Sequence, residues 1–303
     1  DKECIILGDG ASSKTVHIAL DDLGARSIIH VSRHEPPFYD DIDQFKDTAQ
    51  IIINCTPVGM YPNSPQTLID ITNFTALTGV VDLIYNPRRT VLLLQAEMMD
   101  IPYSDGLPFL VAQGVEAAKH FQGESFGSAE IERILRDIRH EKENIILIGM
   151  PGVGKTTMGR ALGKALNRKW FDADKELIKE IGNISDYITT HGEEAFRKEE
   201  TKMLAKLGQQ TGLVISTGGG CVTVPQNFTH LRQNGRIYQL TQPVERLSTE
   251  GRVLSQGGID RLRELESVRT PMYEAFAQCI IKHRRNIPET VKRIIEDFEA
   301  HLL

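Results

Sequence analysis

Residues 149–156 read Gly-Met-Pro-Gly-Val-Gly-Lys-Thr, which is the pattern G-x-x-x-x-G-K-T of a phosphate-binding loop. An apolar run at 145–148 precedes the loop, and a run compatible with a helix, Met158–Leu166, follows it. In this setting backbone N–H groups and the positive end of a helix can surround phosphate oxygens. The flanking runs favour a nucleotide site over the alternative, a glycine-rich turn ahead of an ordinary helix.

The side chains of this motif indicate what each position would do. Lys155 is expected to reach the β- and γ-phosphates of a nucleoside triphosphate, and the Thr156 hydroxyl is expected to bind Mg²⁺. The predicted ATP-binding residues of the loop are Gly149, Gly152, Val153, Gly154, Lys155, Thr156 and Thr157.

The composition is typical of a globular protein and excludes several classes of function. The 303 residues are 40% hydrophobic and 25% charged, and the formal net charge of −6 argues against a nucleic-acid partner. No apolar run approaches the roughly 20 residues of a membrane span. The four cysteines form no C-x-x-C pair and are typical of reduced thiols in a cytoplasmic protein.

The length predicts two domains. The first residue is Asp1 rather than Met, and it lies two positions before a predicted strand. We therefore expect the chain to be a fragment of a longer protein.

The first half begins with a β-α-β pattern: a strand at Cys4–Leu7, a glycine turn at 8–13, a helix at Lys14–Leu23 and a strand at Ser27–Val31. This order predicts a dinucleotide site at the head of a doubly wound parallel sheet. Ser13 stands where the motif G-x-G-x-x-G has its third glycine, so a plain tight turn remains the alternative.

The second of these strands ends in Ser32-Arg33-His34 and not in an acidic residue. An acidic residue would hold the ribose 2′-hydroxyl of NAD, whereas an arginine and a hydroxyl fit a 2′-phosphate. The strand end therefore favours NADP. The alternative is that Arg33 is a solvated loop side chain.

Three further motifs accompany later elements of the first half. They are NCTPVGM at 54–60, after a strand at Gln50–Asn54; DLIYNPRRT at 82–90, after a strand at Val80–Leu83 and before a helix at Val91–Met99; and GLPFLVAQG at 106–114, which leads a helix to Phe121. With the glycine turn, these motifs resemble the NADP-binding half of shikimate dehydrogenase over about residues 1–123.

The resemblance implies roles for individual residues. The implied NADP-binding residues are Gly8, Gly10, Ala11, Ser12, Ser32, Arg33, Thr56 and Pro57, of which the last two line the nicotinamide side. Tyr85 and Gln113 are implied to lean toward the dehydrogenase substrate.

The first half also departs from that family. The catalytic Lys and Asp of the family lie in an N-terminal domain, and nothing precedes Asp1 here. A site without its acid/base pair is not expected to turn over, so we expect dehydrogenase activity only in a longer parent with that domain. We also expect exposed apolar faces on the helices Leu107–Phe121 and Ile131–Ile138, which that domain would cover.

Residues 124–142 predict a helical connector between two domains. Ile131, Ile134, Leu135 and Ile138 recur at helical spacing, and the segment has no long Gly/Ser tract. The connector is therefore expected to be short and fairly stiff, between domains at 1–123 and 143–303.

Two carboxylates follow the phosphate-binding loop, in a strand predicted at Lys169–Asp174. Asp172 and Asp174 are two residues apart and would point the same way from a strand. One carboxylate near Mg²⁺ and one near an acceptor hydroxyl is what phosphoryl transfer to an alcohol requires. The alternative is that Asp174 caps a helix at Lys175–Ile181.

The rest of the second half alternates elements with glycine-rich loops. A strand at Leu213–Ser216 ends in three glycines at 218–220, which would let a ligand approach the backbone. The glycine-flanked loop 250–258 holds Arg252 and predicts a lid over the phosphates, with a plain mobile loop as the alternative. Further elements are a helix beginning in the run 191–200, a strand at Gly235–Leu240, a helical run around 269–273 and a helix at Pro288–Leu302.

The second half resembles shikimate kinase over about residues 143–303. The resemblance rests on motifs in the family's order, which are GMPGVGKTT, FDADKELIKEIG, GEEAFRKEE, TGGG, the lid and RTPMY. The resemblance implies substrate contacts from Asp174, Arg197, Gly218, Gly219, Gly220 and Arg269, with Asp174 orienting the attacking hydroxyl and the two arginines binding the carboxylate. It also implies that Asp172 joins Thr156 at Mg²⁺, that Arg246 lies near the adenine and that Arg252 is the lid arginine. The sequence departs from the family pattern in the lid, where Val253 and Ser255 replace a Pro and a Leu, although the arginine is kept.

We therefore predict two α/β domains, a Rossmann-like doubly wound sheet followed by a P-loop kinase. The predicted reaction is ATP plus shikimate to shikimate 3-phosphate and ADP, with Lys155, Asp174 and Arg252 as catalytic residues and Mg²⁺ as cofactor. The alternatives are a related kinase, for example for gluconate, and a nucleotide-binding module without transfer. An NADP-sensing or scaffolding role of the first half also stays open.

Overall fold

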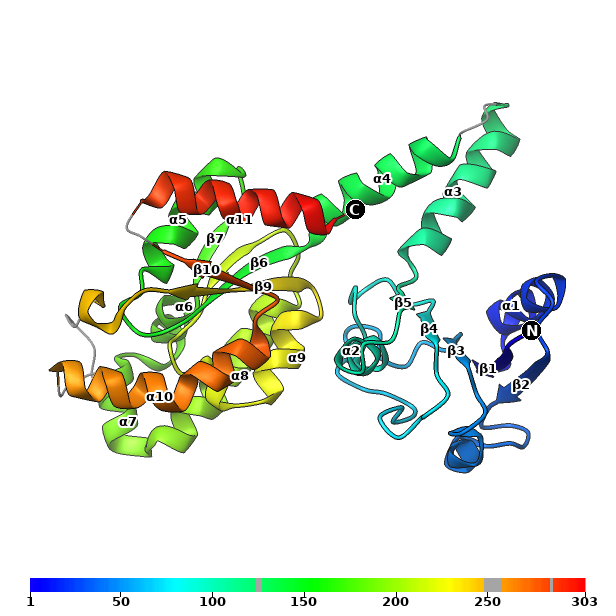
Figure 1. Ribbon diagram of the computed structural model, residues 1–303, viewed down its shortest axis with the longest axis horizontal. Helices are drawn as coiled ribbons and strands as arrows, with labels where there is room; N and C mark the ends of the chain where they lie inside the picture. Colours follow the sequence, from blue (N-terminus) through cyan, green and yellow to red (C-terminus); the bar gives the residue numbers. More distant parts are fainter. Residues whose placement is uncertain (124–126, 248–257, 284–285, 303) are drawn as a thin grey trace. The chain divides into compact units, whose positions relative to one another are not determined.

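In the computed structural model, the residues described here are 1–123, 127–247, 258–283 and 286–302 (Figure 1). They form two compact units, which we call the N-terminal unit (residues 1–135) and the C-terminal unit (residues 136–303). Both units are parallel sheets with helical crossovers, as predicted. None of the described helices is long and apolar enough to cross a membrane.

The described part of the N-terminal unit contains a parallel sheet in the order β2-β1-β3-β4-β5. The strands are β1 (Glu3–Leu7), β2 (Ser27–Val31), β3 (Ile51–Asn54), β4 (Gly79–Asp82) and β5 (Tyr103–Ser104). The helices are α1 (Ala11–Asp22), η1 (Tyr39–Phe45), α2 (Val91–Met98) and α3 (Leu107–Gln122). The chain leaves β1 toward β2 and returns on its other side to β3, so the strand order reverses at β1. A crevice at such a reversal is where doubly wound sheets bind ligands.

Apolar side chains build this sheet and leave part of α3 uncovered. Ile5, Leu7 and Ile52 are buried in the core of the unit. On α3, Leu110 and Phe121 are exposed, and Phe121 keeps 88% of its accessible surface. The predicted exposure is therefore present on this helix.

The described part of the C-terminal unit contains a second parallel sheet, in the order β10-β9-β6-β8-β7. The strands are β6 (Asn144–Ile148), β7 (Trp170–Asp172), β8 (Val214–Ser216), β9 (Gly235–Thr241) and β10 (Cys279–Lys282). The main helices are α5 (Lys155–Ala165), α6 (Ala173–Ile181), α7 (Ile184–His191), α8 (Glu193–Gly208), α9 (Gln226–Arg232), α10 (Gly258–Phe276) and α11 (Ile287–His301), with short turns η2 (Cys221–Thr223) and η3 (Val244–Arg246). Figure 1 shows α5 and α11 on one face of this sheet and α8, α9 and α10 on the other.

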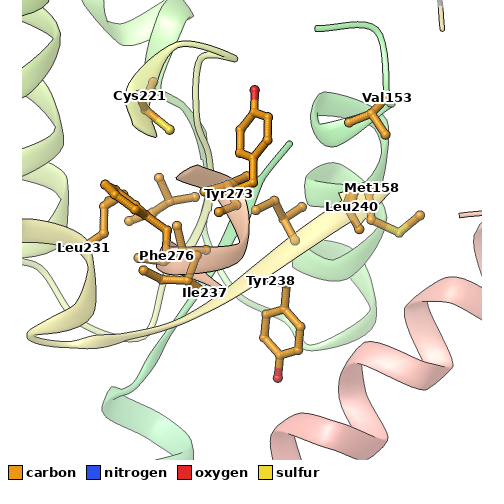
Figure 2. Close-up of a cluster of buried hydrophobic side chains, with 14 of the residues drawn as sticks. Val153, Met158, Cys221, Leu231, Ile237, Tyr238, Leu240, Tyr273 and Phe276 are labelled. Carbon is orange, nitrogen blue, oxygen red and sulfur yellow. The ribbon is translucent and has the colours of Figure 1, made fainter. Parts of the chain in front are cut away.

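The central strand β6 explains where the site lies. All five of its residues are buried, as expected for a strand covered on both faces. Figure 2 shows how the layers meet: Val153 from the loop after β6, Met158 from α5, Ile237 and Leu240 from β9 and Phe276 from α10 belong to one apolar cluster. This packing fixes the loop after β6 at the carboxyl end of the central strand, which is the point where the strand order reverses.

Helix α4 (Ser128–Lys142) lies within the segment 124–142, which was predicted to be a connector, and crosses the division between the units. Its C-terminal end is joined to the C-terminal unit by backbone carbonyls. His140 and Glu143 accept hydrogen bonds from the Arg168 guanidinium, and Lys142 accepts one from the Gly212 N–H. Residues 140–143 are therefore part of the packing of the second sheet.

Candidate active site

The phosphate-binding loop lies at the carboxyl end of β6 and leads into α5, as predicted. Gly149, Gly152 and Gly154 have φ of 138°, 86° and 98°, a region that favours glycine. A Cβ on Gly149 would lie 2.4 Å from the Leu240 carbonyl oxygen, so this position also requires glycine for close approach to β9.

The Lys155 side chain lies across this loop. Its Nζ donates to the carbonyl oxygens of Gly149 (2.7 Å) and Met150 (3.1 Å), and the side chain is buried. The amine is therefore held at the centre of the turn. Val153 is buried in the core, so only its backbone is available to a ligand, whereas Thr157 is exposed in the first turn of α5.

Thr156 and Asp172 form a pair of oxygen ligands next to the loop. The Thr156 hydroxyl donates to Asp172 Oδ2 at 2.7 Å, and Asp172 Oδ1 accepts from the Lys175 N–H at 3.4 Å as the N-cap of α6. The described residues hold no group of three or more His, Cys, Asp or Glu side chains around a metal position. A hydroxyl and one carboxylate fit Mg²⁺, which usually keeps water and phosphate ligands.

The predicted strand over Lys169–Asp174 was wrong at its end. Strand β7 stops at Asp172, and Asp174 is the second residue of α6. The capping side chain is Asp172 and not Asp174, because the Asp172 carboxylate accepts a hydrogen bond from the free N–H of Lys175 in the first turn of the helix. The Asp174 carboxylate does not cap the helix and instead lies next to the backbone of Gly218, the first of three consecutive glycines.

The three glycines at 218–220 follow β8 and are lined by charged side chains. A Cβ on Gly218 would lie 2.7 Å from both Asp174 Oδ1 and Glu200 Oε1. A Cβ on Gly220 would lie 2.3 Å from both terminal nitrogens of Arg197. These glycines therefore allow two carboxylates and a guanidinium to approach the same stretch of backbone.

Arg197 is the most constrained of these charges. Its Nη1 donates to Glu200 Oε2 at 2.7 Å and its Nη2 to Glu193 Oε1 at 2.9 Å, whereas Nε is buried without a partner among the described residues. Burial alone would lower the pKa of Arg197, but the two carboxylates hold it above its ordinary value. The guanidinium is therefore a fixed positive charge.

Sequence reasoning missed Glu200. It is 2% exposed, burial raises the pKa of its carboxyl, and Arg197 opposes this rise. The signal was present in the sequence, because positions 197 and 200 are three residues apart on a helix and share a face.

Helix α10 reaches the same glycines from the other side. Arg269 Nη1 donates to the Gly219 carbonyl at 3.0 Å, and the Tyr273 hydroxyl donates to the same oxygen. A Cβ on Gly219 would lie 2.7 Å from Pro151, so this glycine touches the phosphate-binding loop. The substrate-binding residues predicted for the C-terminal unit thus meet beside the predicted phosphate site.

The two remaining predicted nucleotide contacts are Arg246 and Arg252. Arg246 is exposed in η3, and its carbonyl accepts a hydrogen bond from Gln242. Arg252, with Val253 and Ser255, lies outside the described residues.

The glycine turn of the N-terminal unit follows β1. Gly8 has φ of 105°, and a Cβ there would lie 2.9 Å from Thr56 Cγ2, so the turn contacts the loop after β3. Gly10 caps α1, and Ala11 and Ser12 are exposed in its first turn. Ser13 is fully buried and its hydroxyl donates to the Gly10 carbonyl at 2.7 Å, which closes the turn without a third glycine.

The end of β2 is arranged around Ser32 and His34. The buried Ser32 hydroxyl accepts from the N–H groups of His34 (3.1 Å) and Glu35 (3.3 Å), while Arg33 is exposed. His34 Nδ1 lies 2.6 Å from Asp9 Oδ2, and this contact holds the pKa of Asp9 below its usual range. Sequence reasoning missed this pair. A cavity of about 690 Å³ here is lined by Asp9, Ser13, Lys14, His17, Ile18, His30, Ser32, His34, Glu35 and Pro36.

Asp82 joins the motifs at 54–60 and 82–90. Its buried carboxylate accepts from Asn54 Nδ2 (3.0 Å), the Ile84 N–H (3.0 Å) and the Thr90 hydroxyl (2.7 Å). Asn54 Oδ1 in turn accepts from the N–H and hydroxyl of Thr56. Burial raises the pKa of Asp82 to about 6, and the three hydrogen bonds oppose that rise.

Three other predicted residues of this unit are solvent-accessible. Pro57, Tyr85 and Gln113 are exposed, and Tyr85 retains 51% of its surface. Their assigned roles stay predictions.

Comparison with known proteins identifies the C-terminal unit. The shikimate kinase family model matches residues 151–299. The shikimate kinase of Hahella chejuensis is 36% identical over 162 residues, which are 51% of this chain and 84% of that protein. The shikimate kinase of Caldicellulosiruptor bescii is 39% identical over 140 residues, 44% of this chain and 81% of that protein. The chain belongs to the shikimate kinase family.

Solved structures agree with this assignment. Shikimate kinase from Acinetobacter baumannii, in complex with shikimate, shares 31% identity with a TM-score of 0.51, and covers 55% of this chain and 98% of its own. The N-terminal unit is similar to part of a chorismate mutase/shikimate 5-dehydrogenase fusion protein from Clostridium acetobutylicum, at 30% identity and a TM-score of 0.42. This likeness covers 46% of this chain and 53% of the fusion protein.

Proposed function

We propose that the C-terminal unit transfers the γ-phosphoryl group of ATP to a hydroxyl of shikimate, giving shikimate 3-phosphate and ADP. One observation carries this proposal: Asp174, Arg197 and Arg269 converge on Gly218–Gly220, and Gly219 touches the phosphate-binding loop at Pro151. Groups that recognise a carboxylated polyol thus lie next to groups that hold phosphates.

On the nucleotide side, we assign the phosphates to the loop from Gly149 to Gly154 and to Lys155. The glycine backbone supplies N–H donors, and the amine supplies a positive charge held by two carbonyls. Thr156 and Asp172 would hold Mg²⁺. Bound Mg²⁺ would neutralise charge on the phosphate oxygens.

On the substrate side, Arg269 and Arg197 are placed to bind the shikimate carboxylate, since planar guanidinium groups match carboxylates. Arg197 is preset by Glu193 and Glu200, so little reorganisation is needed when substrate binds. Asp174 is assigned to the attacking hydroxyl, which it would orient and from which it would accept the proton. Catalysis is then mainly positioning and charge stabilisation.

The test is an ADP-release assay with ATP, Mg²⁺ and shikimate on this chain and on Asp174→Asn. We expect turnover that depends on shikimate and falls at least about 100-fold in the variant, the usual size of a general-base effect. Gluconate is assayed in parallel. Turnover with gluconate but not with shikimate would establish the rival kinase, and ATP binding without turnover on either compound would establish the non-catalytic module.

For the N-terminal unit we propose binding of NADP at the turn between β1 and α1. The supporting observations are the strand reversal at β1, the Gly8–Thr56 contact and the cavity at the end of β2. Titration of this chain with NADPH and NADH, followed by cofactor fluorescence, tests the proposal. Absence of binding for both cofactors would overturn it, and preferential NADH binding would overturn the choice of cofactor.

A further inference from the structure

The phosphate-binding loop of the kinase is contacted by two side chains outside its motif. Strand β9 ends at Thr241 and β10 at Lys282, and these strands are paired in parallel. The next residue after each strand, Gln242 and His283, reaches the loop. The His283 N–H donates to the Thr241 carbonyl at 2.8 Å, so the strand pairing continues to this point.

Gln242 connects the loop to η3. Its Nε2 donates to the carbonyl oxygens of Gly152 (3.3 Å) and Arg246 (3.2 Å). The Gln242 Oε1 atom is buried and has no hydrogen-bond donor in the described part of the chain. An unsatisfied buried acceptor costs free energy. The Gln242 amide therefore takes its orientation from the carbonyls of Gly152 and Arg246, although this leaves Oε1 without a donor among the described residues.

His283 approaches the loop one glycine further on. The side chain is buried, and a Cβ on Gly154 would lie 3.6 Å from His283 Nε2 and 3.7 Å from Cδ2. The Nε2 edge of the imidazole therefore faces Gly154, the residue that caps α5.

The other ring nitrogen of His283 is fixed by α11. Nδ1 lies 3.2 Å from the Thr290 hydroxyl, and that hydroxyl donates its proton to the Asn286 carbonyl at 2.8 Å. The hydroxyl can therefore only accept from His283, so Nδ1 carries a proton. The ring is held in one orientation by a helix that does not belong to the loop.

We propose that Gln242 and His283 are positioning residues that hold Gly152 and Gly154 in the phosphate-binding conformation and thereby set the affinity for the nucleotide. Both glycines have positive φ, and glycine moves easily between backbone regions. The motif alone therefore does not keep the loop in one conformation, and contacts from β9 and β10 reduce the ordering cost of binding. The inference rests on the proposed ATP site.

Steady-state kinetics of the full chain test the inference, with ATP and shikimate varied in turn and thermal unfolding recorded for each variant. Gln242→Ala is expected to raise the KM for ATP about five- to tenfold, the size expected for one lost hydrogen bond, and His283→Ala is expected to raise it by a similar factor through lost packing on Gly154. The kcat and the KM for shikimate should stay within about twofold, because the contacts described above for both residues are with the phosphate-binding loop, η3, β9 and α11. A purely structural role would lower the unfolding midpoint without this selective change in KM.

Two substitutions separate the two edges of the imidazole. His283→Asn retains a donor near the position of Nδ1 for Thr290 but lacks the edge that faces Gly154, so it should behave like His283→Ala. His283→Gln places an amide near the position of Nε2 and should restore much of the affinity. A variant His283→Asn with wild-type KM for ATP would overturn the role of the Nε2 edge, even if His283→Ala proves too unstable to assay.

Gln278 provides a matched control at the other ends of the same strands. Its Oε1 accepts from the Ile237 N–H at 3.0 Å and its Nε2 donates to the Phe276 carbonyl at 3.2 Å. Gln278→Ala should leave the KM for ATP unchanged. An equal rise in Gln278→Ala, or no rise in Gln242→Ala and His283→Ala, would overturn the inference. A wild-type chain without ATP- and shikimate-dependent turnover would overturn the proposed function itself.

Discussion

Each unit places a glycine turn between its first strand and the following helix, but the two turns are built differently. In the C-terminal unit, Lys155 lies across the turn and bonds to two of its carbonyls. In the N-terminal unit, the charged side chain within the turn is Asp9, and its partner is His34 at the end of β2. The turn of the C-terminal unit is therefore occupied by a positively charged side chain, whereas the turn of the N-terminal unit contains a negatively charged one.

This difference shows what determines the function of a glycine turn. In both units the glycines allow a ligand to approach the backbone closely. The charges and side-chain contacts around the turn then determine which ligand can bind there. The eight-residue motif of the C-terminal unit includes those side chains. The turn of the N-terminal unit does not, and its partners, His34 and Thr56, come from the segments that follow β2 and β3. The following predictions test this contrast, from the largest expected effect to the smallest.

Removing the positive charge should have the largest effect. Lys155→Ala is expected to lower kcat by about 10²–10³, as for other positioned groups that stabilise transition-state charge. Lys14→Ala removes a lysine that lines the N-terminal cavity and should leave kinase turnover unchanged. The ADP-release assay measures both. Retention of more than about a tenth of the wild-type kcat in Lys155→Ala would contradict the assigned role.

The second-largest effect is expected from replacing a glycine by alanine in the kinase site. In Gly220→Ala the new Cβ would meet the terminal nitrogens of Arg197, which Glu193 and Glu200 hold in place. We expect kcat/KM for shikimate to fall at least about tenfold, a loss of about 1.4 kcal/mol in transition-state binding, with little change in ATP affinity. A Cβ on Gly10 meets no protein atom within 4 Å, so Gly10→Ala should not lower the unfolding midpoint of the N-terminal unit, although its methyl group would enter the proposed NADP site. No loss of kcat/KM for shikimate in Gly220→Ala would show that the contact with Arg197 does not matter.

The buried carboxylate behind the N-terminal turn should make that unit sensitive to pH. The pKa of Asp82 is about 6 in the folded unit, against about 3.9 in an unfolded chain. Between these values only the folded unit keeps the proton, so this group lowers the free energy of unfolding as pH rises from about 4 to about 6. The loss is about 3 kcal/mol, and no further change is expected above about pH 7, where the group has lost its proton in the folded unit as well.

Asp82→Asn does not titrate and isolates this effect. The difference in unfolding free energy between wild type and variant should change by about 3 kcal/mol between about pH 4 and pH 7. Trp170 is the only tryptophan of the chain and reports on the C-terminal unit, so a circular dichroism transition without a matching fluorescence change reports on the other unit. A constant difference across this pH range would contradict the assignment.

Removing the negative charge from the N-terminal turn should have the smallest effect. Asp9→Asn is expected to raise NADPH affinity by a factor of about two to five at low salt, because an exposed carboxylate repels phosphate only weakly in water. The gain should fade at high salt. Fluorescence titration at two ionic strengths measures this change, and an affinity that is unchanged at low salt would show that Asp9 does not face the cofactor.

The sequence predicted most of the fold, because the buried strands are continuous apolar runs such as Ile145–Ile148 and because Gly149–Thr156 constrains its surroundings. It failed where tertiary packing decides. The α6 boundary depends on the Asp172 side chain, which caps the helix, so Asp174 moved from the expected strand to a helix.

Other site residues left only weak signals in the sequence. Glu200 shares a helix face with Arg197 and could have been found from the spacing. Gln242 and His283 could not have been found in this way, because their contact with the loop depends on the pairing of β9 with β10. That pairing brings together residues more than 40 positions apart. Asp82 was quoted within its motif, but its role as the acceptor for three donors from separate positions follows only from the folded structure.

The continuity of α4 with β6 has a consequence for exchanging or excising modules. The carbonyls of His140 and Lys142 complete hydrogen bonds with Arg168 and Gly212 in the body of the kinase. A kinase chain cut to start at Glu143 would leave those donors unpaired at the base of the strand that carries the phosphate-binding loop. The portable catalytic module therefore includes the last turn of the connector, and a recombination point is better tolerated upstream, near residue 127.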